Sequence, residues 1–232
     1  PPFNERREQG MARWTTDKEL FSLMKNELFT ALVGDVLDTM GLTKQFLPPR
    51  IRPLLPETTL AGRAMTVLEA DCCGAGRKPF GLMFEALDDL KEDEVYICAG
   101  GSPDFAHWGG LMTIRAKHLN AAGAVTHGYT RDTRQVLELD FPVFSWGTYA
   151  QDQGARGRVI DWRCPVEFVN GVRVETGDLL FGDMGGVVVV PRAVESEVIE
   201  KALEKAEGEN LVAKAIMGGM STVEAFATFG IM

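Results

Sequence analysis

Strand-like and helix-like segments alternate along the middle of the chain, and this alternation limits the fold more than any other feature of the sequence. The strand-like runs are short and apolar, the segments between them have helical spacing, and in chain order they cover residues 60–70, 80–90, 94–99, 109–120, 124–126, 133–139 and 143–146. Strands joined through a helix lie parallel in one sheet. The sequence therefore predicts an α/β fold with a partly parallel sheet.

A different pattern begins after Pro165, where apolar and polar residues alternate on both sides of the pair Asn170-Gly171. Asn-Gly between two alternating runs is the strongest short-range signal of a β-hairpin. Further strand-like runs follow at 179–181 and 187–190. We therefore expect this part of the chain to add antiparallel strands, which makes the sheet mixed.

Helices are predicted at both ends of the chain. Residues 16–40 contain two segments with helical spacing, and Thr16 is a candidate N-cap. A long helix is predicted from residue 192 to residue 217, because a charged, alanine-bearing segment follows Pro191. Ser221 and Glu224 have the spacing of a capping box, which predicts a second, shorter helix.

These features divide the chain into an N-terminal arm (1–15), a single α/β domain (16–191) and a C-terminal helical extension (192–232). The long helix is polar over much of its surface and needs a surface to pack on. We expect that surface to be a neighbouring subunit, because a single chain has difficulty covering the apolar residues of the extension. These residues are Ile199, Leu203, Leu211 and Phe226.

The excess of acidic over basic residues limits the kinds of molecule that the protein is expected to bind. Asp and Glu number 33 against 24 Lys and Arg, so the formal net charge is −9. Binding to nucleic acid depends on clustered basic residues, so neither nucleic acid nor a membrane is an expected partner. No apolar run approaches the roughly 20 residues that cross a bilayer. The four cysteines lack CxxC spacing and residues 1–10 lack a secretory signal, which predicts a reducing, cytoplasmic setting.

The first candidate site is the start of the helix expected at 109–120, which follows a loop at 102–108. Backbone N–H groups of Gly110, Leu111 and Met112 are expected to point into this loop, because the first turn of a helix leaves them unpaired. The positive end of the helix dipole favours an anion, so a small carboxylate fits there. A plain tight turn, in which glycine supplies backbone freedom, is the alternative.

The second candidate is the pair Arg131-Asp132, which emerges just past the strand expected at 124–126. Open α/β sheets bind ligands at the carboxyl ends of their parallel strands, and the helix start at Gly110 lies at the same edge. A guanidinium can bind a carboxylate or a developing enolate through two N–H groups, and a carboxylate can hold a hard divalent cation. A local surface ion pair is the alternative interpretation.

Two other features of the sequence match no metal-binding or nucleotide-binding motif. His107, His118 and His127 match no zinc-binding spacing, although His127 is close enough to a strand end to line a pocket. The glycine-containing stretch at 74–78 has neither the Walker spacing nor the context of a dinucleotide-binding loop. We expect a flexible turn there.

An ordered set of short motifs resembles the RraA-like family between residues 30 and 191. The motifs are Gly110, Gly123-Ala124-Val125-Thr126, Arg131-Asp132, Phe141-Pro142-Val143-Phe144, Gly177-Asp178-Leu179-Leu180-Phe181-Gly182-Asp183 and Gly186-Val187-Val188-Val189-Val190-Pro191. The family includes the class II pyruvate aldolases that act on 4-hydroxy-4-methyl-2-oxoglutarate and 4-carboxy-4-hydroxy-2-oxoadipate. It also includes the regulator of ribonuclease activity A.

The resemblance implies a swivelling β/β/α-type domain in a homotrimer, or in a dimer of trimers, with the site between subunits. It implies that Asp132 binds a Mg²⁺ or Mn²⁺ ion and that Arg131 contacts the oxygens of a pyruvyl group. Backbone N–H groups from Gly109 to Met112 hold the carboxylate. This arrangement agrees with the two candidate sites inferred from the residues.

Two positions depart from the family pattern. Residue 110 is often Asp or Glu, and an acidic residue is often found three positions after Asp132, whereas this chain has Gly110 and Gln135. The carboxylates that organise water around the metal are therefore fewer. The resemblance also implies a carboxylate from the C-terminal helix of a neighbouring subunit, for which Glu207 and Glu209 are the candidates.

The expected function is that of a divalent-metal-dependent lyase that cleaves or decarboxylates a small 2-oxo acid through a pyruvate enolate. Arg131 is the expected catalytic residue. Decarboxylation of oxaloacetate needs only chelation and enolate stabilisation, so it should tolerate the lost carboxylates better than retro-aldol cleavage does. The alternative is a non-catalytic, protein-binding regulator of ribonuclease activity, whose acidic surface suits a basic partner.

Overall fold

The computed structural model describes residues 13–74, 76 and 78–231. Most of the predicted N-terminal arm therefore lies outside the described residues, as do Ala75 and Arg77 of the expected turn. The helices are α2 (Asp17–Glu27), α3 (Thr30–Thr39), α4 (Met83–Asp88), α5 (Gly110–His118), α6 (Thr133–Glu138), a 3₁₀ turn η1 (Arg192–Val194), α7 (Glu195–Met217) and α8 (Thr222–Phe229).

The strands form one large mixed sheet and two short pairs. The large sheet has the order β1-β7-β5-β3-β2-β11-β12, with β8 paired to β2 as well, and the short pairs are β9 with β10 and β4 with β6. The strands are β1 (Arg52–Pro53), β2 (Leu60–Asp71), β3 (Glu94–Ala99), β4 (Ala106–Trp108), β5 (Gly123–Thr126), β6 (Tyr129–Thr130), β7 (Val143–Ser145), β8 (Gly157–Trp162), β9 (Val166–Glu167), β10 (Arg173–Val174), β11 (Leu179–Asp183) and β12 (Gly186–Val190). The predicted α/β fold with a mixed sheet is confirmed.

The parallel part of the sheet consists of β2, β3, β5 and β7, whose crossover connections carry α4, α5 and α6. Strand β2 pairs with β3 along one edge, and its other edge is shared by two antiparallel strands. Its first residues pair with β11, and its last residues pair with β8. The sheet curls toward closure, because the Arg52 guanidinium on edge strand β1 donates to the carbonyl of Gly185, in the turn between β11 and β12.

The predicted helix signals are confirmed at atomic detail. The Thr16 side chain accepts a hydrogen bond from the Glu19 N–H group and so caps α2. Ser221 and Glu224 form a complete capping box at the start of α8. Gly171, in the predicted hairpin turn between β9 and β10, has a φ of 80°, which glycine adopts without strain.

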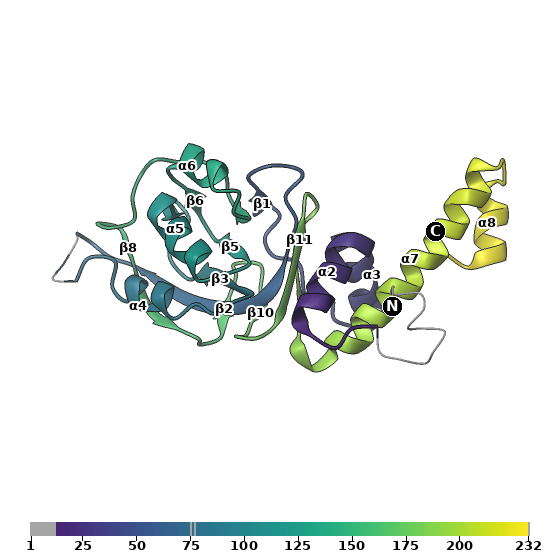
Figure 1. Ribbon diagram of the computed structural model, residues 1–232, viewed down its shortest axis with the longest axis horizontal. Coiled ribbons are helices and arrows are strands. Elements are labelled where there is room, and N and C mark those ends of the chain that lie inside the picture. Colours follow the sequence, from purple (N-terminus) through teal and green to yellow (C-terminus); the bar gives the residue numbers. More distant parts are fainter. Residues whose placement is uncertain (1–12, 75, 77, 232) are drawn as a thin grey trace.

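The C-terminal helices extend away from the α/β body, and α8 folds back along the far part of α7 (Figure 1). The near part of α7 is buried against α2, α3 and the sheet, with Ile199 and Leu203 in the core of the same chain. The expectation that a single chain has difficulty covering these two residues is therefore wrong, because α2 and α3 supply the missing surface. Leu211 and Phe226, farther out, are 57% and 58% exposed.

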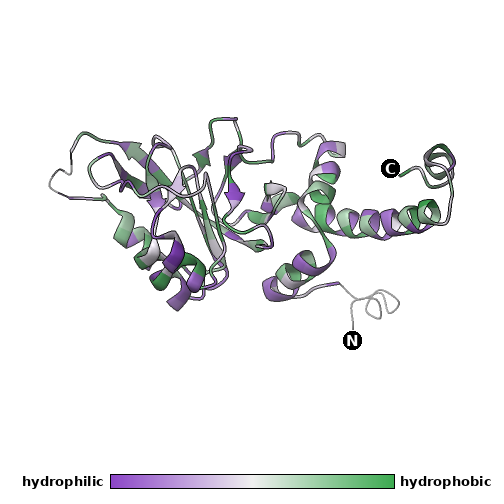
Figure 2. Ribbon diagram, turned by 90° about the horizontal axis from the view of Figure 1, so that it is seen from above, coloured by the Kyte–Doolittle hydropathy of each residue, from purple (hydrophilic) through white to green (hydrophobic). Residues whose placement is uncertain are grey.

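Hydrophobic and hydrophilic residues are interspersed along α7 as it leaves the body of the molecule (Figure 2). Among the described residues, no helix combines the length and the apolar character that crossing a membrane requires.

Candidate functional site

Two short parallel strands bring the predicted site residues together. Trp108 of β4 pairs with Thr130 of β6, so the residues that follow each strand, Gly109 and Arg131, lie side by side. Asp132 then takes a left-handed conformation (φ 53°), which aspartate tolerates better than most residues, and the chain turns into α6. The helix starts of α5 and α6 therefore face one another.

The contacts between these residues are direct. The Gly110 N–H group, at the start of α5, donates a hydrogen bond to Oδ2 of Asp132 over 3.2 Å. The Arg131 guanidinium forms an ion pair with Asp152, with 2.9 Å between Nη1 and Oδ1, and its Nε lies 3.5 Å from Oδ1 of Asp132. Within the part of the chain that the structure describes, this Nε is buried without a hydrogen-bond partner. The Arg131 side chain as a whole is 38% exposed, so a ligand can reach the outer part of its guanidinium.

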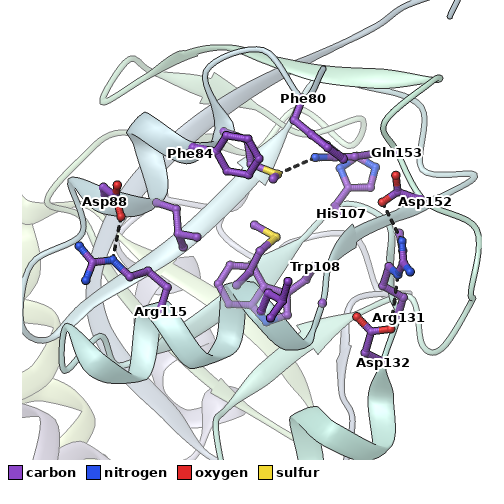
Figure 3. A pocket seen from close by; sticks show the side chains of 16 residues that line it. Phe80, Phe84, Asp88, His107, Trp108, Arg115, Arg131, Asp132, Asp152 and Gln153 are labelled. Carbon is purple, nitrogen blue, oxygen red and sulfur yellow. Dashed lines mark hydrogen bonds and ion pairs between the residues drawn. The ribbon is translucent and has the colours of Figure 1, made fainter. Parts of the chain in front are cut away.

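A pocket of about 590 Å³ opens beside these residues and has two unlike sides (Figure 3). Its polar end contains Gly109, Arg131, Asp132 and Asp152. The rest is largely apolar, and the apolar side chains that line it are those of Phe80, Met83, Phe84, Leu87, Trp108, Leu111 and Met112. In an α-helix the first N–H groups have no intrahelical partner, so those of Leu111 and Met112 can bind an acidic ligand.

The glycines at the start of α5 have different reasons to be there. A β-carbon at Gly109 would lie 3.0 Å from both Arg131 Cγ and Asp132 Oδ2, so glycine allows the close approach of the two segments. At Gly110 the space for a β-carbon is occupied by the Gln135 side chain. The size of the side chain that fits at position 110 thus depends on the side chain at position 135.

Behind the pocket lies a buried cluster of Glu69, Cys98 and His107. Nδ1 of His107 is 2.8 Å from Oε2 of Glu69, and Nε2 is 2.9 Å from the carbonyl oxygen of Ser102. Burial lowers the pKa of His107. The Glu69 carboxylate and the Cys98 side chain together raise this pKa by more than burial lowers it, so the pKa of His107 lies well above its usual range. Both ring nitrogens face oxygen acceptors, so we interpret the ring as a buried imidazolium.

Two groups of side chains have the donor atoms that a metal ion requires. The ligand atoms of Glu69, Cys98 and His107 lie within 4.8 Å of one another, but the ion pair already engages the histidine. Asp132 and Asp152 offer hard carboxylate oxygens at the polar end of the pocket, where each side chain is 41% exposed. Mg²⁺ prefers such oxygens and keeps several water ligands, so this second group fits Mg²⁺ or Mn²⁺ better.

The other predicted residues lie apart from the pocket. Glu207 and Glu209 are on α7, where Glu207 pairs with Arg13 (3.3 Å) and Glu209 pairs with Lys205 (2.6 Å). His127 packs edge-on against Trp146 and Phe168 rather than in this pocket, and burial lowers its pKa.

Sequence reasoning missed Asp152, Gln153 and the apolar wall. One signal was available for Asp152. It is an acidic residue in the loop after β7, and that strand ends at the same edge of the sheet as β5. The apolar wall had no comparable signal, because its residues have the spacing of an ordinary buried helix face.

The mixed sheet and the pocket at paired helix starts define an α/β protein with a site suited to a small anionic ligand. A model of the RraA-like family, described as Aldolase/RraA, matches residues 30–189. The chain belongs to this family.

Relatives and a solved structure agree with this membership. DlpA of Legionella pneumophila is 30% identical over 200 residues, which are 84% of this chain and 31% of DlpA, so the chain spans under a third of that relative. A Halalkalibacterium halodurans protein with the provisional name 4-hydroxy-4-methyl-2-oxoglutarate aldolase is 32% identical over 85% of this chain and 89% of its own length. The crystal structure of an uncharacterized protein from Pseudomonas syringae superposes with a TM-score of 0.80 at 26% identity, covering 93% of this chain and 96% of that one.

Proposed function

We propose that this protein is a divalent-metal-dependent lyase that cleaves or decarboxylates a small 2-oxo acid through the enolate of pyruvate. The observation that carries the proposal is the meeting of Arg131, Asp132 and the start of α5 at the polar end of one pocket. The family description, which names aldolases, supports the same class of reaction.

Each residue has a role in binding the pyruvyl part of the substrate. The N–H groups of Leu111 and Met112 bind the carboxylate, helped by the positive end of the helix dipole. Arg131 binds the 2-oxo oxygen through the outer part of its guanidinium, because the side chain is 38% exposed at the polar end of the pocket. Asp152 holds the guanidinium in place through the 2.9 Å ion pair.

The chemistry follows from where negative charge develops. Cleavage of the bond at C3 leaves an electron pair that delocalises onto the 2-oxo oxygen, and a fixed guanidinium stabilises that charge in the transition state. Asp132, with Asp152 beside it, would hold Mg²⁺ or Mn²⁺, which supplies Lewis-acid polarisation of the same oxygen when bound. Arg131 is the catalytic residue of this proposal.

Of the two reactions, oxaloacetate decarboxylation requires fewer groups from the site. Retro-aldol cleavage of 4-hydroxy-4-methyl-2-oxoglutarate additionally requires a base to take a proton from the 4-hydroxyl group. Gly110 and Gln135 lack the carboxylates that the resemblance leads us to expect at these positions. A carboxylate from a neighbouring subunit, Glu207 or Glu209, would compensate in a homotrimer or a dimer of trimers.

The three-part division of the chain and the cytoplasmic setting belong to the same proposal. The exposed outer part of α7 supports packing of residues 192–232 on a neighbouring subunit. The four cysteines are unpaired, which suits a reducing compartment.

A non-catalytic regulator is the second candidate. The family description also names RraA, and the net charge of −9 suits a basic protein partner. In that case the pocket residues would have no effect on the protein's activity.

The decisive experiment measures oxaloacetate decarboxylation by the purified protein with Mg²⁺ or Mn²⁺, before and after chelation with EDTA. We expect turnover that chelation abolishes and that added metal restores. Turnover at the same rate in EDTA would contradict the metal dependence. No turnover in either condition, for a protein shown to be folded by circular dichroism, would favour the regulator.

A further inference from the structure

Among the described residues, every basic side chain that lines the pocket already has an acidic partner. The basic residues that line the pocket are Arg115 and Arg131, apart from His107, which is paired with Glu69. Arg115 forms a 2.7 Å ion pair with Asp88, and Arg131 is engaged by Asp152. Figure 3 shows these two pairs on opposite sides of the pocket. The pyruvyl group uses Arg131 and the start of α5, whereas a second carboxylate at the far side would meet the negative charge of Asp88 beside Arg115.

Between the two pairs, the wall is made of large apolar side chains. Phe80 precedes α4, Met83 and Phe84 are its first two residues, and Met112 comes from α5. The rings of Phe80 and Phe84 lie 5.7 Å apart and are inclined by 57°. Phe84 is 55% exposed, although an aromatic ring of this size is normally covered. An apolar group bound against this wall would shield the Phe84 ring from water.

The backbone at Phe80 is held in a costly conformation. Its φ is 65°, in the left-handed region that bulky residues rarely adopt. Strand β8 holds it there, because the Val159 N–H group donates to the Phe80 carbonyl over 3.1 Å. Such strain persists when the surroundings enforce it, and it concentrates at functional sites. The chain therefore keeps a phenyl ring at the pocket where glycine would be relaxed.

We propose that Phe80, Met83 and Phe84 bind an apolar substituent at C4 of a 4-hydroxy-2-oxo monocarboxylic acid. This inference rests on the proposed lyase function and specifies its substrate class. The preferred substituent is an alkyl or aryl group rather than a second carboxylate.

The corresponding step is a retro-aldol cleavage. The 4-hydroxyl group loses its proton to the carboxylate proposed from a neighbouring subunit, Glu207 or Glu209, the C3–C4 bond breaks, and C4 becomes the carbonyl carbon of an apolar aldehyde. The electron pair of the broken bond remains on the pyruvyl fragment as the enolate. Protonation at C3 then yields pyruvate, so no oxidant or reductant is needed.

Two substrates of nearly the same shape test the proposal. They are 4-hydroxy-2-oxo-6-methylheptanoate and 4-hydroxy-2-oxoadipate, which differ at the end of the chain by an isopropyl group against a carboxylate. Pyruvate release from each is followed by NMR with Mg²⁺ present. We expect kcat/KM to be at least about tenfold higher for the isopropyl compound, because apolar pockets discriminate by roughly 10–200-fold. Equal values, or a preference for the adipate, would overturn the proposal.

Variants locate the preference in the wall. Phe84→Arg adds a cation to it, and Asp88→Asn frees Arg115 without changing the apolar surface. Each should lower the ratio of the two kcat/KM values several-fold. Phe29→Arg is the matched control, because Phe29 is 48% exposed, lies at the start of α3 and does not line the pocket. An unchanged ratio in both pocket variants, with both shown to be folded, would contradict the assignment of these residues.

A separate measurement distinguishes failure of this inference from failure of the proposed function. Enolate formation exchanges the methyl protons of pyruvate for deuterium in D₂O, whatever substituent the pocket prefers. Exchange by the wild-type protein without preference for the isopropyl substrate would overturn the substrate class alone. Absence of exchange in the presence of metal would overturn the lyase function, and the substrate class with it.

Discussion

A β-carbon on residue 110 would lie 2.0 Å from Oε1 of Gln135, so the side chain of Gln135 occupies the space that a side chain at 110 would need. Gly110 does not use a left-handed backbone conformation, and Gln135 is exposed and flexible. The residue types that fit at positions 110 and 135 therefore depend on one another. A carboxylate at 110 can be accommodated if residue 135 makes room for it.

The first prediction concerns this pair. Gly110→Asp combined with Gln135→Ala should raise retro-aldol activity toward 4-hydroxy-4-methyl-2-oxoglutarate by at least about tenfold, because a positioned proton-transfer group contributes roughly 10²–10⁴-fold where a mechanism needs it. Oxaloacetate decarboxylation should change little. Gly110→Asp alone should show a smaller gain and a lower melting temperature, because Gln135 must move. If both activities fall together in a properly assembled double variant, the open space at Gly110 serves to admit the ligand.

The second prediction concerns Arg131. Arg131→Lys should reduce kcat/KM for oxaloacetate by about 100-fold, because an ammonium group cannot engage Asp152 and the substrate oxygen through a planar fork. Arg134→Lys is a matched control, since Arg134 is exposed on α6 and pairs with Glu138 alone among the described residues. Full activity of Arg131→Lys would identify Arg131 as a structural residue.

The third prediction concerns the buried Glu69–His107 pair. Because the folded state raises the pKa of His107, the stabilisation is complete below the unfolded pKa of about 6.5 and is lost as the pH rises through the folded value. Urea unfolding at pH 6 to 9 should therefore show wild-type stability declining relative to His107→Gln. Burial raises the pKa of the neighbouring Cys98, so the thiol stays neutral over most of this range. Parallel stability profiles of the two proteins would show that His107 is neutral in the folded state.

The fourth prediction concerns assembly. Leu211 on α7 and Phe226 on α8 are exposed apolar residues, and such residues are covered when subunits associate. Light scattering should give the mass of a trimer or hexamer, and Leu211→Glu with Phe226→Glu should reduce it. Val169→Glu, in the hairpin between β9 and β10, is the control, because Val169 is an exposed apolar residue outside the C-terminal helices. A stable wild-type monomer at micromolar concentration would contradict the expected assembly.

The elements that could be predicted from the sequence are those with a strong apolar signal. Strand β3 matches the predicted range 94–99, and every residue of it after the first is buried. Strand β8 was missed because it carries Arg158 and Asp161 and is only partly buried, so its sequence resembles a loop. Pairing with the end of β2, which no local pattern encodes, makes it a strand.

The same distinction applies to the site. The proximity of Gly110 and Asp132 follows from a general rule about the ends of parallel strands, so it could be predicted. Asp152 is positioned by an isolated bridge with Ala106, and the Glu69–His107 pair joins β2 to β4 across a large sequence separation. Contacts of this kind depend on the assembled tertiary structure and have no local sequence signature.

The packing of α2 and α3 has a consequence for the order of events during synthesis. Their apolar faces lie against β11, β12 and the near part of α7, so these helices are synthesised well before their main partners. About 140 residues separate the end of α3 from the start of β11, which at ~5–20 residues per second amounts to on the order of ten seconds on the ribosome. During that interval a nascent chain presents an amphipathic helical pair without its main partners. Chaperone capture of the emerging chain would therefore be concentrated on residues 17–39.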